Sequence, residues 1–465
     1  EFSLLIGVSF LFAAACRPFV VIRGWKFLVS AALLIWLPVL PNDTHLQRMG
    51  LQCILTSYLI VASIGLVLRW KAPAGEQYRW GALLGLFFSL NYLNREESAY
   101  ASALILFSLF LFGLLSKIGG CFSWKRSGTI AVTIALCATP LIAAVCTLNY
   151  RSYGVFLTTM RRSTAFTAAY QRLTSLEPEF HKRYIPITRR TRLHAYELSP
   201  TFAKLQPILE GHGSYWVAGS EDHSLLNGYT AADREFFISN FEFALEYGAS
   251  VCGATNAVEA ERFFAKIDQE LSSAVRAGRI HAGIHGPAIL AAPVSGDIER
   301  ILKGSWESYH NLVVLKFAGL GGWGEKPSGD EPEFQKISLF VHSSLMAEPL
   351  DGIQYRARVR ILGVINQICR ILYCITIPIM LVVSIYSYVR NRAAFFSGSL
   401  VVTVPLLAVV LFCFTMAVID TLGFRFLENW SYNSMGFSPI SVLSAFTFVI
   451  TLGAFQKSQI PAKAA

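Results

Sequence analysis

The four residues Asn94-Arg95-Glu96-Glu97 place two carboxylates and a guanidinium between two apolar segments. Adjacent carboxylates at the rim of a membrane can orient a hydroxyl nucleophile, act as a general base or hold a divalent metal ion. The guanidinium of Arg95 can clamp a phosphate with paired hydrogen bonds. Glu96 and Glu97 are therefore candidate catalytic residues, with Asn94 and Arg95 as candidate substrate-binding residues. The alternative is a solvated turn between two helices, whose charges mark the membrane interface.

A second polar loop, from Asp420 to Ser438, could form another wall of the same site. Asp420 is a candidate catalytic carboxylate, and Arg425 and Glu428 are candidate substrate ligands. Aromatic residues interleave with these charges, as they do on a sugar-binding platform and equally in the aromatic belt at a membrane interface. Both interpretations of this loop stay open.

Arginines supply further candidates for phosphate binding. Arg370 lies inside the apolar start of the seventh apolar segment, where it can snorkel to the surface or hold a lipid phosphate. A basic stretch follows the sixth segment, and its only acidic residues are Glu177 and Glu179. That stretch fits phosphate recognition, a contact with lipid headgroups or a solvated surface. Its basic residues are Arg151, Arg161, Arg162, Arg172, Lys182, Arg183, Arg189, Arg190 and Arg192.

Motifs for metal binding or nucleophilic catalysis are scarce. His281 and His285 are four residues apart, but Gly283, Gly286 and Pro287 disfavour the helix that would bring them together. No CxxC, GxSxG or HExxH pattern occurs in the sequence. No residue is therefore assigned as a metal ligand, and a divalent metal at the paired carboxylates is the one cofactor considered.

The composition indicates a membrane protein. Hydrophobic residues make up 54% of the 465 residues and charged ones only 15%, against about 25% in soluble domains. The apolar residues come in blocks long enough to cross a hydrocarbon core of about 30 Å. We therefore predict an all-α fold, a polytopic transmembrane helical bundle. Nine spans are predicted, at about 2–16, 27–41, 51–68, 80–93, 99–116, 128–147, 363–388, 395–419 and 435–455.

The loops between these spans alternate in charge. Odd-numbered loops carry Lys and Arg, whereas the short even-numbered loops are neutral or acidic. The positive-inside rule assigns the odd-numbered loops to the cytoplasm. The segment from Tyr150 to Arg358 holds 22 Lys and Arg against 23 Asp and Glu, and the rest of the chain holds 18 against 7. This excess beside the spans suits membrane lipids as partners, and it gives no case for nucleic acid.

The same pattern predicts the domain organisation of a bacterial inner-membrane protein. Residues 1–148 form six spans, 149–360 a mainly helical extracytoplasmic domain, 361–456 three further spans, and 457–465 a cytoplasmic tail. Because Glu1 opens directly on an apolar run, we expect the natural N-terminus to lie further upstream. Helices of the outer domain are expected at 164–176, 200–209, 231–247, 257–277 and 297–315, with Thr230 and Asn256 as N-caps.

Several stretches resemble known membrane proteins. The span ending in Asn91-Tyr92-Leu93-Asn94-Arg95-Glu96-Glu97 resembles an element of the multi-spanning bacterial glycosyltransferases of the GT-C superfamily. The outer domain resembles that of a largely uncharacterised group of bacterial membrane proteins with the same layout. The matching stretches are 149–154, 169–173, 185–188 and 196–202, and a later run from Phe241 through Ala244 and Gly248 to Glu270.

The resemblance implies an inverting transferase that takes its sugar from a polyprenyl phosphate, the lipid-phosphate donor, at the outer membrane face. GT-C enzymes typically carry an acidic residue in the first external loop, and that loop would lie before Glu1 here. The alternative is a non-catalytic membrane-embedded structural or accessory subunit, which would dock protein partners through its outer domain. A transporter is disfavoured, because few ionisable residues stand in mid-span and no paired broken helices are seen.

Overall fold

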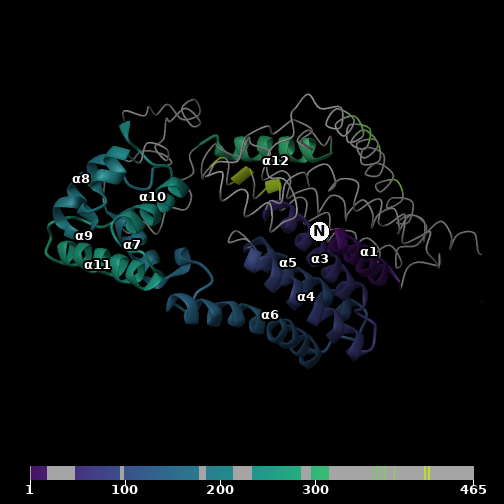
Figure 1. Cartoon of the computed structure of the whole chain (residues 1–465). Helices are drawn as coiled ribbons and strands as arrows, with labels where there is room; N and C mark the ends of the chain where they lie inside the picture. Colours follow the sequence, from purple (N-terminus) through teal and green to yellow (C-terminus); the bar gives the residue numbers. More distant parts are fainter. Residues whose placement is uncertain are drawn as a thin grey trace, which may run out of the picture. The chain divides into compact units, whose positions relative to one another are not determined.

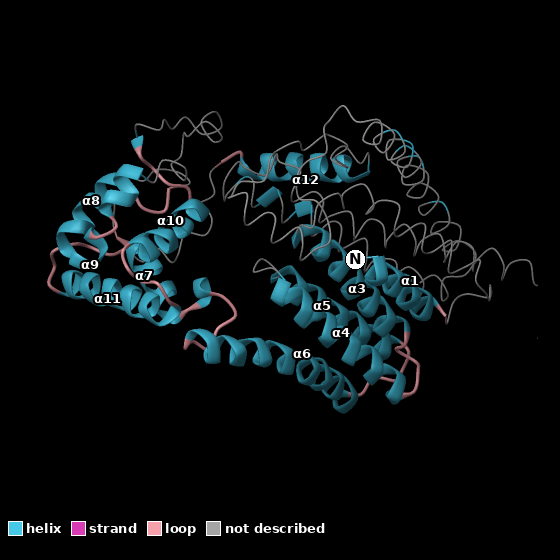
Figure 2. Cartoon of the chain, in the orientation of Figure 1, coloured by secondary structure: helices cyan, strands magenta, loops and turns pink. Residues whose placement is uncertain are grey.

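The computed structural model describes residues 2–17, 48–94, 99–176, 185–212, 233–283 and 295–313, with ten single positions between 360 and 421. These residues are helical, with one isolated antiparallel bridge between Leu176 and Ala282 and no β-strand among them (Figures 1 and 2). The all-α prediction is confirmed for this part of the chain. The chain divides into two compact units, one of residues 1–135, 307–412 and 430–465 and the other of 136–306 and 413–429.

The first unit is built around α3 (Arg48–Leu68), which packs against α1 (Phe2–Cys16), α4 (Ala74–Asn94) and α5 (Ala99–Ile118). Every residue from Ile54 to Leu68 is buried. A helix that is apolar on all sides lies inside its bundle, and α3 fits this rule. The predicted spans 2–16, 51–68, 80–93 and 99–116 all fall on these helices, although α4 begins six residues earlier than its span.

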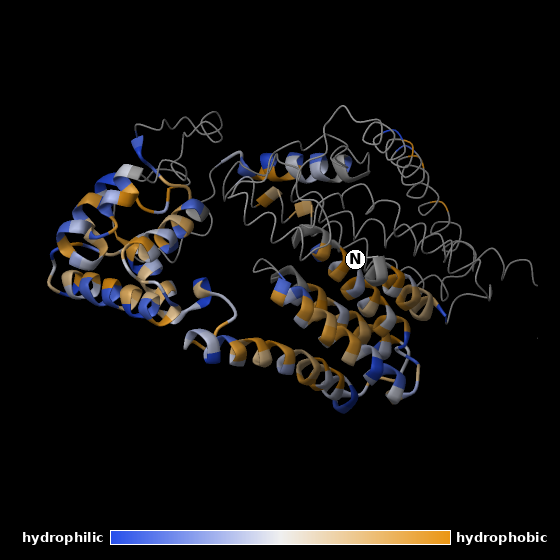
Figure 3. Ribbon diagram, in the orientation of Figure 1, coloured by the Kyte–Doolittle hydropathy of each residue, from blue (hydrophilic) through white to orange (hydrophobic). Residues whose placement is uncertain are grey.

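The helix α6 (Trp124–Tyr153) is long and apolar enough to cross a membrane. It extends the predicted span 128–147 at both ends. Three shorter apolar helical stretches, Ile6–Cys16, Ile54–Leu68 and Leu104–Ile118, occur elsewhere in the described residues. Hydrophobic residues run along α5 and α6 in Figure 3, whereas α11 carries mixed colours. The predicted spans 27–41, 363–388, 395–419 and 435–455 lie outside the continuously described ranges.

The second unit has its own core of aromatic and aliphatic side chains. The rings of Phe166 and Phe264 meet edge to face with centroids 4.8 Å apart, and those of Tyr196 and Phe202 stack at 4.7 Å. The long helix α11 packs along α7, and Phe264, Ile267 and Leu271 of α11 are buried there. Its helices are α7 (Thr164–Ser175), α8 (Arg189–Leu198), α9 (Pro200–Ala203), α10 (Ile238–Val251) and α11 (Ala257–Arg276), with a 3-10 turn η2 (Met160–Arg162) and a π-helical turn η3 (Ile208–His212). The helix α12 (Asp297–Val313) is divided between the two units after Trp306.

Two predicted helices of this unit have different limits in the structure. The helix expected at 200–209 stops at Ala203, because Pro207 has no N–H to donate to the carbonyl of Ala203. The helix expected at 231–247 begins only at Ile238, because Arg234 has a φ of 53°, which a right-handed helix excludes. The prediction of Thr230 as its N-cap is therefore wrong.

One helix was not predicted at all. The helix α8 begins after Thr188, whose hydroxyl accepts a hydrogen bond from the backbone N–H of Thr191. In contrast, the prediction for α11 is confirmed. Asn256 accepts from the N–H of Glu259 at its start, and Gly278 takes a φ of 67° just past its end.

Candidate functional site

A ladder of three amide side chains connects α3 to the end of α4. Gln52 Nε2 donates to Asn91 Oδ1 at 3.0 Å, and Asn94 Nδ2 donates to Gln52 Oε1 at 2.8 Å. Asn91 Nδ2 donates in turn to Thr56 Oγ1 at 3.1 Å. The side chains of Gln52 and Asn91 are fully buried. An amide can donate and accept at once, so this amide ladder fixes both the rotation and the register of α4 against α3.

The helical period explains why these residues meet. Asn91 and Asn94 are three residues apart and share one face of α4, and Gln52 and Thr56 are four apart on α3. Asn94 is thus the last rung of the amide ladder and the last residue of α4. The candidate residues Arg95, Glu96 and Glu97 follow it directly and lie outside the described residues. Of the four residues from Asn94 to Glu97, the structure therefore describes only Asn94, which is held by its hydrogen bond to Gln52.

The other predicted site residues are not brought together in the described part of the chain. Arg151 lies exposed in the last turn of α6. Asp420, Arg370, Arg425 and Glu428 lie outside the described residues, so the second wall proposed from the sequence stays a prediction.

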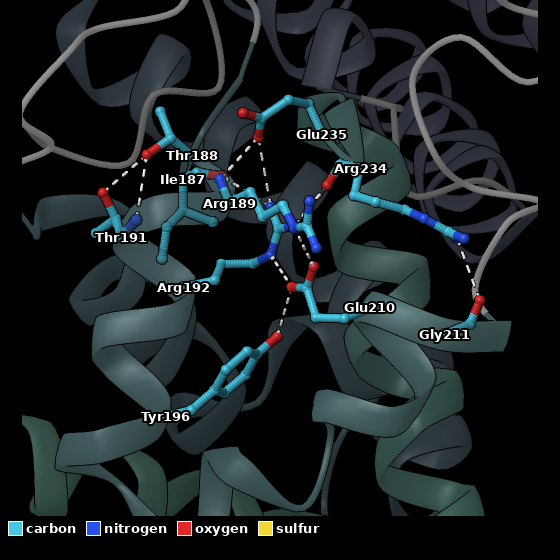
Figure 4. A network of polar contacts seen from close by, with 10 residues as sticks. All are labelled: Ile187, Thr188, Arg189, Thr191, Arg192, Tyr196, Glu210, Gly211, Arg234 and Glu235. Atoms are coloured by element: carbon cyan, nitrogen blue, oxygen red, sulfur yellow. Dashed lines mark hydrogen bonds and ion pairs between the residues drawn. The ribbon is translucent and has the colours of Figure 1, made fainter. Parts of the chain in front are cut away.

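The second unit holds a buried charge network centred on Arg192 (Figure 4). Its guanidinium is fully buried and pairs with Glu210 at 2.9 Å and Glu235 at 3.6 Å. It also donates to the backbone carbonyls of Ile187 and Arg234. The Phe236 ring stands 4.7 Å from the guanidinium carbon. These contacts tie α8 to η3 and to the segment that precedes α10.

Three further hydrogen bonds, two from Arg189 and one from Tyr196, complete this network. Arg189 Nε donates to Glu210 Oε2 at 3.1 Å, and the backbone N–H of Arg189 donates to Glu235 Oε2 at 2.9 Å. The Tyr196 hydroxyl donates to Glu210 Oε1 at 3.0 Å. Burial, together with the neighbouring Glu210 carboxylate, raises the pKa of Tyr196. Tyr196 therefore stays a neutral hydrogen-bond donor at neutral pH.

The charge network coincides with two unusual backbone conformations. Glu210 lies in the π-helical turn η3, and Arg234 takes the left-handed conformation, which costs about 1 kcal/mol or more for a residue with a side chain. Arg234 Nη1 also donates to the carbonyl of Gly211 at 3.2 Å. The buried guanidinium of Arg192 accounts for this conformation, because it needs the carbonyl of Arg234 as an acceptor.

A second carboxylate, Glu270 of α11, caps the short helix α9. Its Oε2 accepts from Ser199 Oγ at 2.6 Å and from the backbone N–H of Thr201 at 3.0 Å, and its Oε1 accepts from Thr201 Oγ1 at 2.8 Å. Partial burial opposes ionisation, but the hydrogen bonds from Ser199 and Thr201 outweigh it and hold the pKa of Glu270 below its usual value. Glu270 is thus an acceptor of structural bonds.

The basic stretch after α6 needs a correction. In the sequence, Glu177 and Glu179 are its only acidic residues, but later helices supply carboxylates that pair with its arginines. Arg161 pairs with Glu246 at 3.1 Å, and Arg172 pairs with Asp268 at 3.3 Å. With Arg189 and Arg192 also paired, four of its cations are held by carboxylates and stabilise the fold of the second unit.

The polar contacts in the described part of the second unit hold its helices together. Among the described residues, no group of three His, Cys, Asp or Glu side chains could hold a metal ion. No known protein family, curated protein or solved structure matches this chain. The site that geometry supports best is therefore the end of α4, where the amide ladder leads into the predicted carboxylates.

Replacing Arg192 with methionine should destabilise the second unit. The substitution leaves the buried carboxylate of Glu235, which is 2% exposed, without its cation. We expect a loss of about 3–5 kcal/mol in the free energy of unfolding, measured by denaturant titration of the detergent-solubilised chain. The matched control is Arg262→Met, an exposed arginine of α11. Equal stability of the two variants would contradict this assignment.

The Glu270 cap should make stability depend on acid. Because its folded-state pKa lies below that of the unfolded chain, its contribution is present above about pH 4.3 and is lost as the pH falls through the folded value. Melting temperatures measured from pH 7 to pH 3 should fall more steeply for the wild type than for Glu270→Gln. Parallel curves would show that Glu270 does not carry this dependence.

Proposed function

We propose that this chain is a polytopic membrane glycosyltransferase of the GT-C kind, acting at the outer face of a bacterial inner membrane. The observation that carries the proposal is the amide ladder of Gln52, Asn91 and Asn94. Burying hydrogen-bonded amides among apolar helices is costly unless their geometry is used, and polar groups inside membrane bundles mark functional sites. Here the ladder holds the last turn of α4 rigid, directly before Arg95, Glu96 and Glu97.

The proposed chemistry assigns a role to each predicted residue. The acceptor hydroxyl attacks the anomeric carbon of the sugar, its proton passes to Glu96 or Glu97, and the bond from that carbon to the phosphate oxygen breaks. Polyprenyl phosphate leaves with the bonding electron pair. Arg95 and Arg370 bind the phosphate and offset its growing charge. From the sequence, Arg151 is a further candidate phosphate ligand, Asp420 a further candidate catalytic carboxylate, and Arg425 and Glu428 are further candidate substrate ligands.

Rigid placement matters for this reaction. Holding the general base and the phosphate clamp in fixed positions removes much of the entropic cost of reaching the transition state. The amide ladder supplies such placement, since each rung is a directional bond between two helices. Two of its three amides, Gln52 and Asn91, are fully buried, which supports a positioning role.

The roles of Glu96 and Glu97 can be tested by incubating the purified protein with a panel of polyprenyl-phosphate sugars. Glu96→Gln and Glu97→Gln should still retain the lipid in native mass spectrometry, but at least one should release polyprenyl phosphate about 100-fold more slowly, as loss of a general base does. Arg95→Gln should lose the lipid itself. Glu299→Gln, an exposed carboxylate of α12, is the control. Full turnover in both variants, or no lipid bound by the wild type, would refute the proposal.

The amide ladder has its own test. In Gln52→Met/Asn91→Leu, apolar side chains of similar size replace the buried amides, so the stability of the bundle should change little. Release of polyprenyl phosphate should nevertheless slow, with lipid retention intact, because α4 loses its fixed register. Unchanged turnover in a folded variant would show that the ladder positions nothing. Thermal unfolding in detergent checks the fold.

A non-catalytic docking subunit is the second candidate, and α10 favours it. Phe243, Tyr247 and Val251 stand four residues apart along one face of α10 and are all exposed. Apolar side chains gathered on one surface suit a protein partner. Tolerance of Glu96→Ala and Glu97→Ala, together with a stoichiometric partner that co-purifies and is lost in Tyr247→Glu, would support this function over transfer.

A further inference from the structure

A hollow of about 610 Å³ opens where the turn between α3 and α4 meets the start of α6. Its charged lining consists of Lys71, Lys125 and Arg126, and no Asp or Glu lines it. All the charged side chains that line this hollow are therefore positive. It belongs entirely to the first unit of the chain.

The two turns that form the hollow are held together by specific contacts. The indole of Trp70 packs so closely on Gly119 that a Cβ at that glycine would overlap the ring. Cys121 Sγ lies 3.8 Å from the carbonyl of Trp70, and the guanidinium of Arg126 donates to the carbonyl of Ala72. The spacing of the cations is therefore set by the fold.

The three cations lack neutralising partners within the described chain. No ion pair joins Lys71, Lys125 or Arg126 to a described carboxylate, although Arg69 nearby pairs with Glu76 at 3.4 Å. Lys71 Nζ stands 4.5 Å from the centre of the Trp70 ring. Arg126 Nε is buried and has no hydrogen-bond acceptor among the described residues. A buried donor of this kind is costly unless a ligand satisfies it.

Two helices begin at the hollow and add to its positive potential. The helix α4 starts at Ala74, which lines the hollow, and α6 starts at Trp124, between the lining residues Ser123 and Lys125. The N-terminal end of a helix carries a partial positive charge that favours anions, phosphate above all. Cations and helix ends thus favour the same kind of ligand.

We propose that this hollow binds a phosphate group, carried either by the headgroup of an anionic lipid or by a soluble phosphate ester. The charge alternation of the loops assigns Lys71, Lys125 and Arg126 to the cytoplasmic face. The phosphate-binding hollow is therefore separate from the transfer site proposed at Glu96 and Glu97, and it does not depend on that activity. Basic pockets between helices on the cytoplasmic side bind lipid phosphates in this way.

The full chain in detergent tests the proposal by native mass spectrometry, with phosphatidylglycerol or phosphatidylcholine added. The test variant is Lys71→Gln/Lys125→Gln, which leaves the Arg126 contact to Ala72 in place. The matched control is Arg79→Gln/Lys117→Gln, which removes two exposed charges of α4 and α5 that do not line the hollow. Both variants therefore lower the net charge equally. Thermal unfolding verifies that both are folded.

We expect the wild type and the control to prefer phosphatidylglycerol, and the test variant to bind it at least about tenfold more weakly than the control. Displacement by millimolar inorganic phosphate would assign the site to soluble phosphate esters, and resistance to it would assign the site to a lipid headgroup. Equal losses in the two variants would overturn the proposal, because the attraction would then be a diffuse effect of charge. Binding of neither phosphatidylglycerol nor inorganic phosphate by the wild type would overturn it too.

Discussion

The cost of burying polar groups shapes both described units of this protein. An unpaired charge or amide inside an apolar bundle costs several kcal/mol, so each one must find its partner within the chain. Arg192 meets this demand with two carboxylates and two carbonyls, and Gln52 and Asn91 meet it with each other. Arg69, which directly follows α3 and is 7% exposed, donates to the carbonyls of Ala14 and Ala15 at the end of α1. These bonds determine which helices pack together.

Two stretches of the second unit, 196–202 and 241–270, serve this packing. Ser199 and Thr201 donate hydrogen bonds to Glu270, which joins these stretches across 69 or more residues of sequence. Gly248 permits a close approach to Leu205, since a Cβ there would meet Leu205 Cδ2 at 2.9 Å. Such residues maintain the fold of the second unit. The proposal of sugar transfer therefore rests on the end of α4.

The sequence signals that predict a helix lie within the helix or next to it. The contacts that the sequence did not predict join residues that are far apart in the chain. The caps Asn256 and Gly278 and the apolar face of α11 are encoded within about 20 residues, so the sequence alone predicts that helix. The carboxylates that pair with Arg192, those of Glu210 and Glu235, are 18 and 43 residues away in the sequence. No pattern in the residues next to Arg192 predicts these pairs. The start of α10 was mispredicted for the same reason. Arg234 takes its left-handed conformation next to the buried guanidinium of Arg192, which is distant in the sequence. The sequence indicated Asn94 as a candidate site residue. It could not predict the amide ladder, because the ladder depends on how α3 and α4 pack together.

The two proposed sites lie at opposite ends of one helix. The helix α4 has 21 residues, which corresponds to a length of roughly 30 Å, close to the thickness of a hydrocarbon core. Its first residue, Ala74, lines the phosphate-binding hollow, and its last residue, Asn94, is the outermost rung of the amide ladder. In the proposed topology these ends reach the cytoplasmic and outer headgroup layers. In the first turn of α4, Gln77 donates to the carbonyls of Arg69 and Trp70, so this end of α4 is bonded to the turn that follows α3. A helix held at both ends in this way resists sliding along α3, and in the proposed topology it would set the depth of both proposed sites in the membrane.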